Sequence, residues 1–246
     1  MTATTRRALI TGATSGIGRA MAEALASQGA HVLVTGRDAR RGEEVVAAIR
    51  TAHGKADFVV ADLSSAASVA NLAVQAEKIL GGVDILINNA GVFSFGPTSE
   101  ATEAAFDAMF DTNVKAPLLL TARLAPAMVR RGWGRIINVT TMVAYVGTPG
   151  AAVYGSSKAA LQLLTQAWAA EFGPGGVTAN SIAPGPVRTP GTSGMGDALD
   201  QLAKTLPAGR VGKPEEVAAA AVFLASEGAS FVNGTTLAVD GGRVAV

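Results

Sequence analysis

The chain has 246 residues, a formal net charge of +1, 49% hydrophobic residues and no cysteine. The balanced charge gives no reason to expect nucleic acid or an anionic membrane as a partner, and the lack of cysteine excludes disulfides and thiolate chemistry. The length suffices for one core, so we expect a single domain over residues 1–246.

The N-terminal segment, MTATTRRALITGA, carries two arginines but no long apolar region and no small-residue cleavage site. It therefore does not resemble a signal peptide. The apolar runs are far shorter than the ~20 residues that span a bilayer. We expect a cytoplasmic protein with no membrane partner.

Short apolar runs alternate with helical patterns along the chain. In order, we expect a strand at 8–10, a helix at 19–28, a strand at 31–35, a helix at 39–52, a strand at 56–61, a helix at 66–80, a strand at 84–87, a helix at 113–131, a strand at 134–139, a helix carrying Tyr154 to about 172, a strand at 177–182, a helix at 215–226 and a strand at 236–239. This alternation predicts a doubly wound, mostly parallel sheet of about seven strands with helices on both faces. The stretch 184–213, rich in Gly, Pro and Thr, predicts a long irregular loop of functional importance.

A glycine-rich turn, TGATSGIG, joins the first strand to the first helix at Thr11–Gly18. Glycines let the backbone turn sharply and approach a ligand closely. The helix that follows directs its free N–H groups and positive dipole end at an anion, as in dinucleotide pyrophosphate binding. The spacing G-x-x-x-G-x-G is a variant of the usual dinucleotide pattern, and a tight turn without a ligand is the alternative.

Tyr154 and Lys158 are four residues apart in VYGSSKAALQLLTQ, so a helix places them on one face. At an effective dielectric of about 20, unit charges about 4 Å apart interact by ~4 kcal/mol. We therefore expect the ammonium to lower the pKa of the tyrosine and make it a usable acid or base. The alternative is a lysine that extends past a half-buried ring to reach solvent.

Together these motifs resemble the short-chain dehydrogenase/reductase family over almost the whole chain. The motifs that carry the resemblance are TGATSGIG, NNAG at Asn88–Gly91, Tyr154-x-x-x-Lys158, Asp62, Asn113, Pro184–Gly185 and VDGG at Val239–Gly242. The resemblance implies a Rossmann fold, a nicotinamide cofactor and a tyrosine-assisted hydride transfer. It also implies a homotetramer formed through the long helices that carry Asn113 and Tyr154.

The resemblance also assigns roles to individual residues. Tyr154 is expected to donate or accept the proton, Lys158 to tune it and hold the nicotinamide ribose, and Asn113 to position a water in a proton relay. The expected cofactor-binding residues are Gly12, Ser15, Gly16, Ile17, Gly18, Arg37, Asp62, Leu63, Asn89, Ala90, Gly91, Tyr154, Lys158, Pro184, Gly185, Val187 and Thr189. No metal site is expected, since neither His31 nor His53 has a second histidine nearby.

Thr141 departs from the family pattern, which has a serine thirteen residues before the tyrosine. Its hydroxyl can still donate to a carbonyl oxygen, although its branched Cβ restricts χ1 and adds a methyl group. Thr140 is the second candidate, but strand alternation aims it the other way.

The cofactor preference follows from the end of the second strand. An NAD site needs a carboxylate there, whereas this chain has Arg37, with Arg40 or Arg41 as additional charge. A guanidinium suits a 2′-phosphate, so NADP(H) is favoured, with NAD(H) possible if Arg37 stacks on adenine or is solvated. Asp38 is expected to cap the next helix.

The resemblance places Phe93, Phe95, Met142, Val143, Tyr145 and the 191–206 loop around the substrate. This mostly apolar frame suggests a neutral hydrophobic ketone or secondary alcohol, or a 3-oxoacyl thioester. Two functions of other classes stay open: a halohydrin dehalogenase-like lyase, and a non-catalytic nucleotide-binding scaffold.

Overall fold

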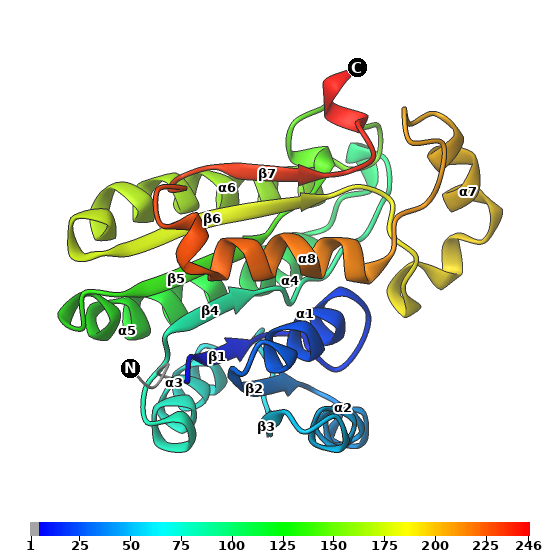
Figure 1. Ribbon diagram of the computed structural model, residues 1–246. Helices are drawn as coiled ribbons and strands as arrows, with labels where there is room; N and C mark the ends of the chain where they lie inside the picture. Colours follow the sequence, from blue (N-terminus) through cyan, green and yellow to red (C-terminus); the bar gives the residue numbers. More distant parts are fainter. Residues whose placement is uncertain (1–4) are drawn as a thin grey trace.

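The computed structural model describes residues 5–246 and contains one seven-stranded sheet (Figure 1). Its strands are β1 (Arg7–Ile10), β2 (His31–Gly36), β3 (Lys55–Val60), β4 (Ile85–Asn88), β5 (Gly134–Val139), β6 (Val177–Pro184) and β7 (Thr236–Val239). The order is β3-β2-β1-β4-β5-β6-β7, and every neighbouring pair is parallel. The expected doubly wound Rossmann fold is confirmed.

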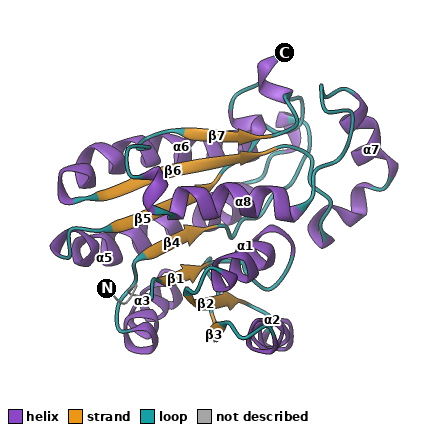
Figure 2. Ribbon diagram, viewed as in Figure 1, coloured by secondary structure: helices purple, strands orange, loops and turns teal. Residues whose placement is uncertain are grey.

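Helices cover both faces of the sheet (Figure 2). On one face lie α1 (Gly16–Ser27), α2 (Ala39–Thr51) and α8 (Pro214–Ala225), and on the other lie α3 (Ala66–Leu80), α5 (Ala116–Arg130) and α6 (Ala152–Phe172). The structure also contains two short helices, α4 (Glu103–Phe110) and α7 (Asp197–Lys204), which the sequence pattern did not predict.

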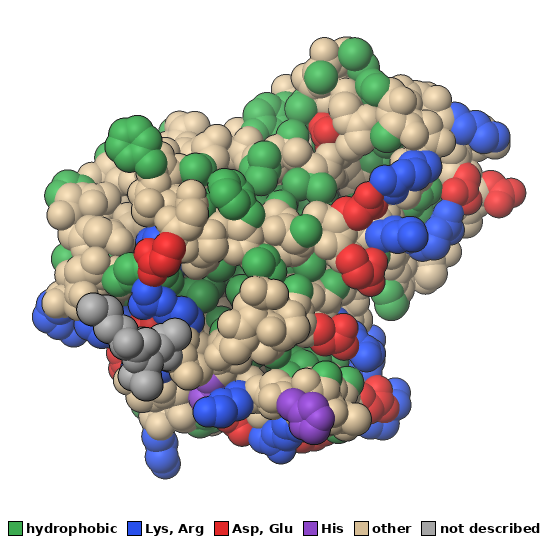
Figure 3. Space-filling view, in the orientation of Figure 1, with side chains coloured by type: hydrophobic (Ala, Val, Ile, Leu, Met, Phe, Trp, Pro, Cys, Tyr) green, Lys and Arg blue, Asp and Glu red, His purple; other side chains and the backbone are tan. Residues whose placement is uncertain are grey.

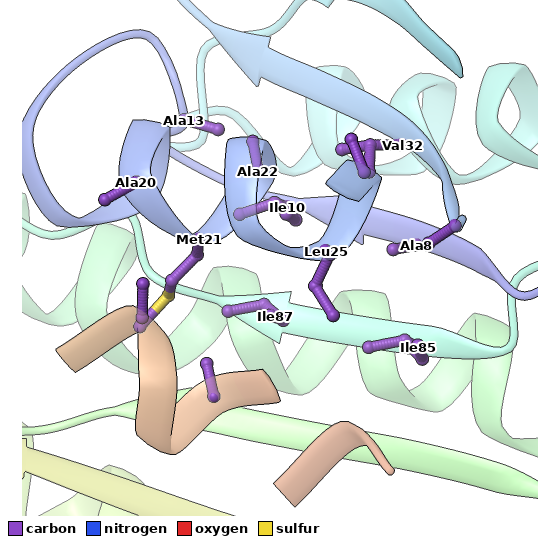
Figure 4. Close-up of a cluster of buried hydrophobic side chains, with 14 of the residues drawn as sticks. Ala8, Ile10, Ala13, Ala20, Met21, Ala22, Leu25, Val32, Ile85 and Ile87 are labelled. Carbon is purple, nitrogen blue, oxygen red and sulfur yellow. The ribbon is translucent and has the colours of Figure 1, made fainter. Parts of the chain in front are cut away.

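Successive strand residues enter opposite layers of the core. Leu9 packs with the α3 and α5 side, whereas Ile10 packs with the α1 and α8 side, and both are fully buried. Figure 4 shows Leu25 of α1 directed towards Ile85 and Ile87 of β4, whereas Met21 of α1 points towards the orange helix α8. Because both faces of each central strand are covered, the strands appear in the sequence as continuous apolar runs without alternation.

The carboxyl ends of all strands lie at one edge of the sheet, the edge where α7 is found (Figure 1). The strand order reverses between β1 and β4, since β2 lies beyond β1 and β5 lies beyond β4. Ligands of open α/β sheets bind in the crevice at such a switch point. The fold therefore directs the segments after β1, β2, β4, β5 and β6 to one site.

Three local expectations were wrong. The stretch 184–213 is not irregular, because it contains a 3₁₀ helix at Pro190–Met195 and α7. The helix expected from residue 113 is α5, which begins at Ala116 after a π-helical turn, Asp111–Lys115. Helix α4 was not expected, although Thr102 caps it by accepting a hydrogen bond from the Ala105 N–H at 3.2 Å. Short helices carry too few turns for their periodicity to stand out.

Charges of both signs lie side by side on the face in Figure 3. Near α7 and α8, Arg188 pairs with Asp200 and Arg210 pairs with Glu216. These two arginines therefore have acidic neighbours and do not form a continuous positive surface near α7 and α8.

Candidate active site

Two adjoining hollows lie at the carboxyl edge of the sheet. The larger one, about 630 Å³, is lined by the glycine-rich turn, the ends of β2 and β3, and the segment after β4. The smaller one, about 220 Å³, is lined by the ends of β5 and β6 and by the start of α6. Asn89 and Gly91 line both, so the two hollows form one continuous site.

The glycine-rich turn approaches the segment after β4 too closely for side chains. A Cβ on Gly12, whose φ is +62°, would lie 2.8 Å from the Cα of Ala90. A Cβ on Gly18 would lie 2.4 Å from both the Gly12 carbonyl oxygen and Asn89 Nδ2. Helix α1 begins beside this turn, so its N-terminal N–H groups and dipole favour an anion there. The larger hollow therefore fits the pyrophosphate of a dinucleotide.

Thr11 and Asn89 fasten the turn to β4. The Thr11 hydroxyl oxygen accepts from the N–H groups of Asn89 and Ala90, each at 3.0 Å. In return, Asn89 Nδ2 donates to the carbonyls of Thr11 and Gly12 at 2.9 and 3.0 Å. Sequence reasoning missed the role of Thr11, although its place as the first residue of TGATSGIG was the available signal.

At the end of β2, Arg37 lines the larger hollow with an exposed side chain. Asp38 caps α2 as expected, accepting from Arg41 N at 3.0 Å and Arg41 Nε at 2.7 Å. Arg40 pairs with Glu44. Among the basic residues considered for a 2′-phosphate, Arg37 is thus the one that has no such acidic partner within residues 5–246.

Asp62 and Leu63 line the larger hollow after β3. Hydrogen bonds from the Ser64 N–H and hydroxyl hold the pKa of Asp62 below its ordinary value, and the Arg37 cation acts in the same direction. Asp62 is therefore a carboxylate acceptor at neutral pH, on the same wall of the hollow as Ser15 and Arg37.

Tyr154 and Lys158 both line the smaller hollow, as their helical spacing predicted. Lys158 is 3% exposed, and its Nζ donates to the Val139 carbonyl at 2.8 Å. Burial lowers the pKa of Lys158 to about 8. Burial also raises the pKa of Tyr154, while the Thr141 hydroxyl acts in the opposite direction. The expectation that Lys158 lowers the pKa of Tyr154 is not met in this structure, because burial dominates and the ammonium is bonded to a carbonyl.

The two threonines after β5 point to different partners. The Thr140 hydroxyl donates to the Ile182 carbonyl at 3.0 Å and is thereby held in the sheet. The Thr141 hydroxyl caps a 3₁₀ turn, accepting from the Val143 N–H at 3.4 Å, and lies close enough to Tyr154 to affect its pKa. Of the two, Thr141 is thus the one whose hydroxyl faces the tyrosine.

Asn113 lies in the π-helical turn and is fully buried. Its Oδ1 accepts from the Val92 N–H and its Nδ2 donates to the Val92 carbonyl, both at 2.9 Å. Its Nδ2 also donates to Ser157 Oγ at 3.0 Å, one residue before Lys158. The amide therefore holds the segment after β4 against the helix that carries Tyr154. Sequence reasoning missed Ser157.

The remaining predicted residues divide into two groups. Ile17, Pro184, Gly185, Val187 and Thr189 line the smaller hollow, as does Thr192, which sequence reasoning did not single out. Within the described residues, Gly16 and Gly18 line neither hollow and instead allow the close packing of the turn. Of the expected substrate frame, Phe93 and, from the 191–206 loop, Thr192 line the smaller hollow, whereas Phe95, Met142, Val143 and Tyr145 do not.

Residues 5–246 contain no group of three or more His, Cys, Asp and Glu side chains arranged to hold a metal ion. His31 Nε2 lies 2.7 Å from Asp57 Oδ2 instead. In the same range, the helices are too short or too polar to cross a bilayer.

Comparisons with known proteins agree with this geometry. Residues 12–243 match the family model described as Enoyl-(Acyl carrier protein) reductase. The chain is 38% identical over 239 residues to gluconate 5-dehydrogenase of Gluconobacter oxydans, covering 96% of this chain and 93% of that protein. It is 36% identical over 236 residues to 3-oxoacyl-[acyl-carrier-protein] reductase of Aquifex aeolicus, covering 95% of each.

A solved structure matches throughout the fold. The blue fluorescent protein from a metagenomic library, in complex with NADPH, superposes with a TM-score of 0.92 at 34% identity. The match covers 96% of this chain and 97% of that one. This chain belongs to the short-chain dehydrogenase/reductase family and is an NAD(P)-dependent oxidoreductase acting on CH–OH or C=O groups.

Proposed function

We propose that this protein is an NADPH-dependent carbonyl reductase, reversible as an alcohol dehydrogenase, for neutral hydrophobic ketones or 3-oxoacyl substrates. The observation that carries the proposal is the shared hollow of Thr141, Tyr154 and Lys158, which joins the dinucleotide-sized hollow through Asn89 and Gly91. We further propose a single dinucleotide-binding and catalytic domain over residues 1–246, with 184–213 as the substrate loop.

In this proposal the cofactor is held along the larger hollow. Gly12, Ser15 and the start of α1 bind the pyrophosphate, and Asp62 with Leu63 contacts the adenine. Arg37 pairs with the 2′-phosphate. This pairing favours NADP(H) over NAD(H), because a guanidinium can donate two parallel hydrogen bonds to phosphate oxygens. The segment Pro184–Thr189 borders the nicotinamide end, which supplies the hydride in reduction and accepts it in oxidation.

Tyr154 acts as the proton donor to the carbonyl oxygen during reduction. The phenol is protonated at neutral pH, since burial holds its pKa above the ordinary value of 10.0, and it therefore carries the proton that reduction requires. The Thr141 hydroxyl donates a second hydrogen bond to the same oxygen and stabilises the negative charge that develops there.

Lys158 holds the ribose of the cofactor and returns a proton to Tyr154. With a pKa of about 8, its amine can release and regain a proton near neutral pH. Asn113 keeps the segment after β4 and the start of α6 in register, and in the proposed relay it positions the water that links Lys158 to solvent.

The test is a panel of ketones, 3-oxoacyl thioesters and sugar acids, run in parallel with NADPH and NADH. We expect turnover of uncharged ketones, with NADPH preferred. Tight cofactor binding without turnover of any carbonyl would instead indicate a scaffold, and halide release from halohydrins without cofactor would indicate the lyase.

A further inference from the structure

Phe93 and Tyr154, which line the smaller hollow, form a closed triangle of aromatic rings with Phe95, which packs on both without lining the hollow itself. The ring centroids of Phe93 and Phe95 are 5.8 Å apart, those of Phe93 and Tyr154 are 5.9 Å apart, and those of Phe95 and Tyr154 are 5.8 Å apart. The planes are inclined by 53°, 57° and 72°. All three separations lie within the range of favourable aromatic contacts.

The segment that carries the two phenylalanines is fixed at both ends. On one side, the Asn113 amide pairs with both main-chain groups of Val92 at 2.9 Å. On the other side, the Gly96 N–H donates to the Gly150 carbonyl at 2.9 Å. The rings between these anchors are therefore held in place, and they do not depend on a mobile loop for their position.

The two phenylalanines retain open surface despite these contacts. Phe93 is 47% exposed and Phe95 is 56% exposed, although both are large apolar side chains. Such paired exposed rings, next to a lined hollow, offer an apolar surface that a ligand can cover.

Charge is scarce in the same hollow. Lys158 is the one charged side chain among its described lining residues, and its ammonium is already bonded to Val139. A substrate carboxylate or phosphate would lose hydration there without gaining a cationic partner, which is costly. The site therefore favours an uncharged substrate.

We propose that Phe93 and Phe95 determine specificity by stacking on a flat ring attached to the reacting carbon, so that the substrates are aryl ketones and the corresponding aryl carbinols. This inference rests on the proposed function. A ring placed on the phenylalanines lies beside Tyr154, the third member of the triangle, where its carbonyl oxygen can take the phenolic proton. In reduction the carbonyl carbon gains the hydride from NADPH, which leaves as NADP⁺, and the oxygen gains the proton from Tyr154.

The test compares acetophenone with cyclohexyl methyl ketone, which has the same carbon skeleton but a puckered, saturated ring. For the unaltered protein we expect kcat/KM to be about tenfold higher for acetophenone, a difference of ~1.4 kcal/mol that aromatic contacts with two rings can supply. In the double variant Phe93→Leu/Phe95→Leu, the ratio should fall close to one, mainly through KM for acetophenone.

Three controls make the outcome decisive. Phe93→Tyr/Phe95→Tyr keeps both rings and should retain the preference, while Phe231→Leu removes an exposed ring elsewhere and should leave it unchanged. Thermal unfolding and cofactor titration verify that each variant is folded. An equal or reversed ratio in the unaltered protein, or a ratio that survives the double Leu variant, overturns the inference.

Calorimetric binding of the two ketones separates this inference from the proposed function. Stronger binding of acetophenone that depends on the two rings, without turnover by either cofactor, would refute the reductase while supporting aromatic recognition. Turnover of both ketones with no difference in binding or rate would refute the aromatic recognition alone.

Discussion

Tyr154 illustrates how burial sets the chemistry of a single residue. A tyrosine of ordinary pKa is already protonated at neutral pH, and burial raises the pKa of Tyr154 further, so the phenol has a proton to give to a carbonyl oxygen. Tyr154→Phe removes that proton but keeps the ring that packs on Phe93 and Phe95. We expect turnover to fall by roughly 10²–10⁴-fold while cofactor affinity changes little. Steady-state rates and NADPH fluorescence titration measure the two, and a near-normal rate would eliminate Tyr154 as the donor.

Lys158 combines function with a cost in stability. Burial lowers its pKa to about 8, from a value of 10.5 when exposed. Between these two pH values the unfolded chain binds more protons, so stability rises with pH across that window and the penalty is fully present below pH 8. We expect Lys158→Met to raise the free energy of unfolding at pH 7 by up to about 3 kcal/mol, with a smaller gain at pH 10, and to abolish turnover. Urea unfolding at both pH values tests this, and equal gains would contradict it.

Arg37 determines cofactor preference if it contacts the 2′-phosphate. Arg37→Asp replaces a guanidinium with a carboxylate that repels phosphate and accepts from a ribose hydroxyl. We expect the NADPH-to-NADH ratio of kcat/KM to fall by roughly 10–100-fold, since a charged hydrogen bond contributes about 1.5–3 kcal/mol. Arg40→Asp is the matched control, because Arg40 pairs with Glu44. If Arg37→Asp and Arg40→Asp show the same NADPH-to-NADH ratio of kcat/KM, the role given to Arg37 is refuted.

Helix α1 packs closely against the glycine-rich turn. A Cβ on Gly18 would meet the Gly12 carbonyl and the Asn89 amide at 2.4 Å, so α1 would have to shift away from the turn. We expect Gly18→Ala to destabilise the protein by about 1–3 kcal/mol and to weaken cofactor binding at least tenfold. Gly147→Ala, where nothing lies within 4 Å of the added carbon, should change neither. Thermal unfolding and cofactor titration compare the two, and unimpaired binding by Gly18→Ala would contradict the close packing.

At the same scale, sequence reasoning succeeded for α3 and failed for α4 and α7. The fifteen residues of α3 repeat their apolar pattern over several turns, and the expected bounds, 66–80, agree with the structure. Helices α4 and α7 have eight residues each, and few of these residues are buried. Helix α4 buries Met109 alone and so gives little periodic signal, whereas α7 has an amphipathic pattern, with Leu199 and Ala203 buried four residues apart, but lies within a stretch rich in Gly, Pro and Thr that favours a loop.

For the whole molecule, we propose a homotetramer formed through the long helices. Leu163 of α6 is 68% exposed and Leu118 of α5 is 40% exposed, so each of the two long helices presents an apolar side chain for another copy to cover. Leu163→Glu should therefore lower the mass in light-scattering chromatography from tetramer to dimer or monomer. Val74→Glu on α3, at a position that is 62% exposed, is the control and should not. A monomeric unaltered protein would refute the proposal.

The sequence by itself determined the sheet, the glycine-rich turn, the cap at Asp38 and the shared helix face of Tyr154 and Lys158, because each depends on neighbours along the chain. Strand alternation already favoured Thr141 over Thr140, but only the tertiary structure showed that β6 holds Thr140, that Asn113 lies in a π-helical turn, and that burial raises the pKa of Tyr154. These properties arise from segments that are distant in sequence and meet at the carboxyl edge of the sheet. Local pattern does not specify which partner a polar side chain finds at that edge, or how deeply Tyr154 and Lys158 are buried there.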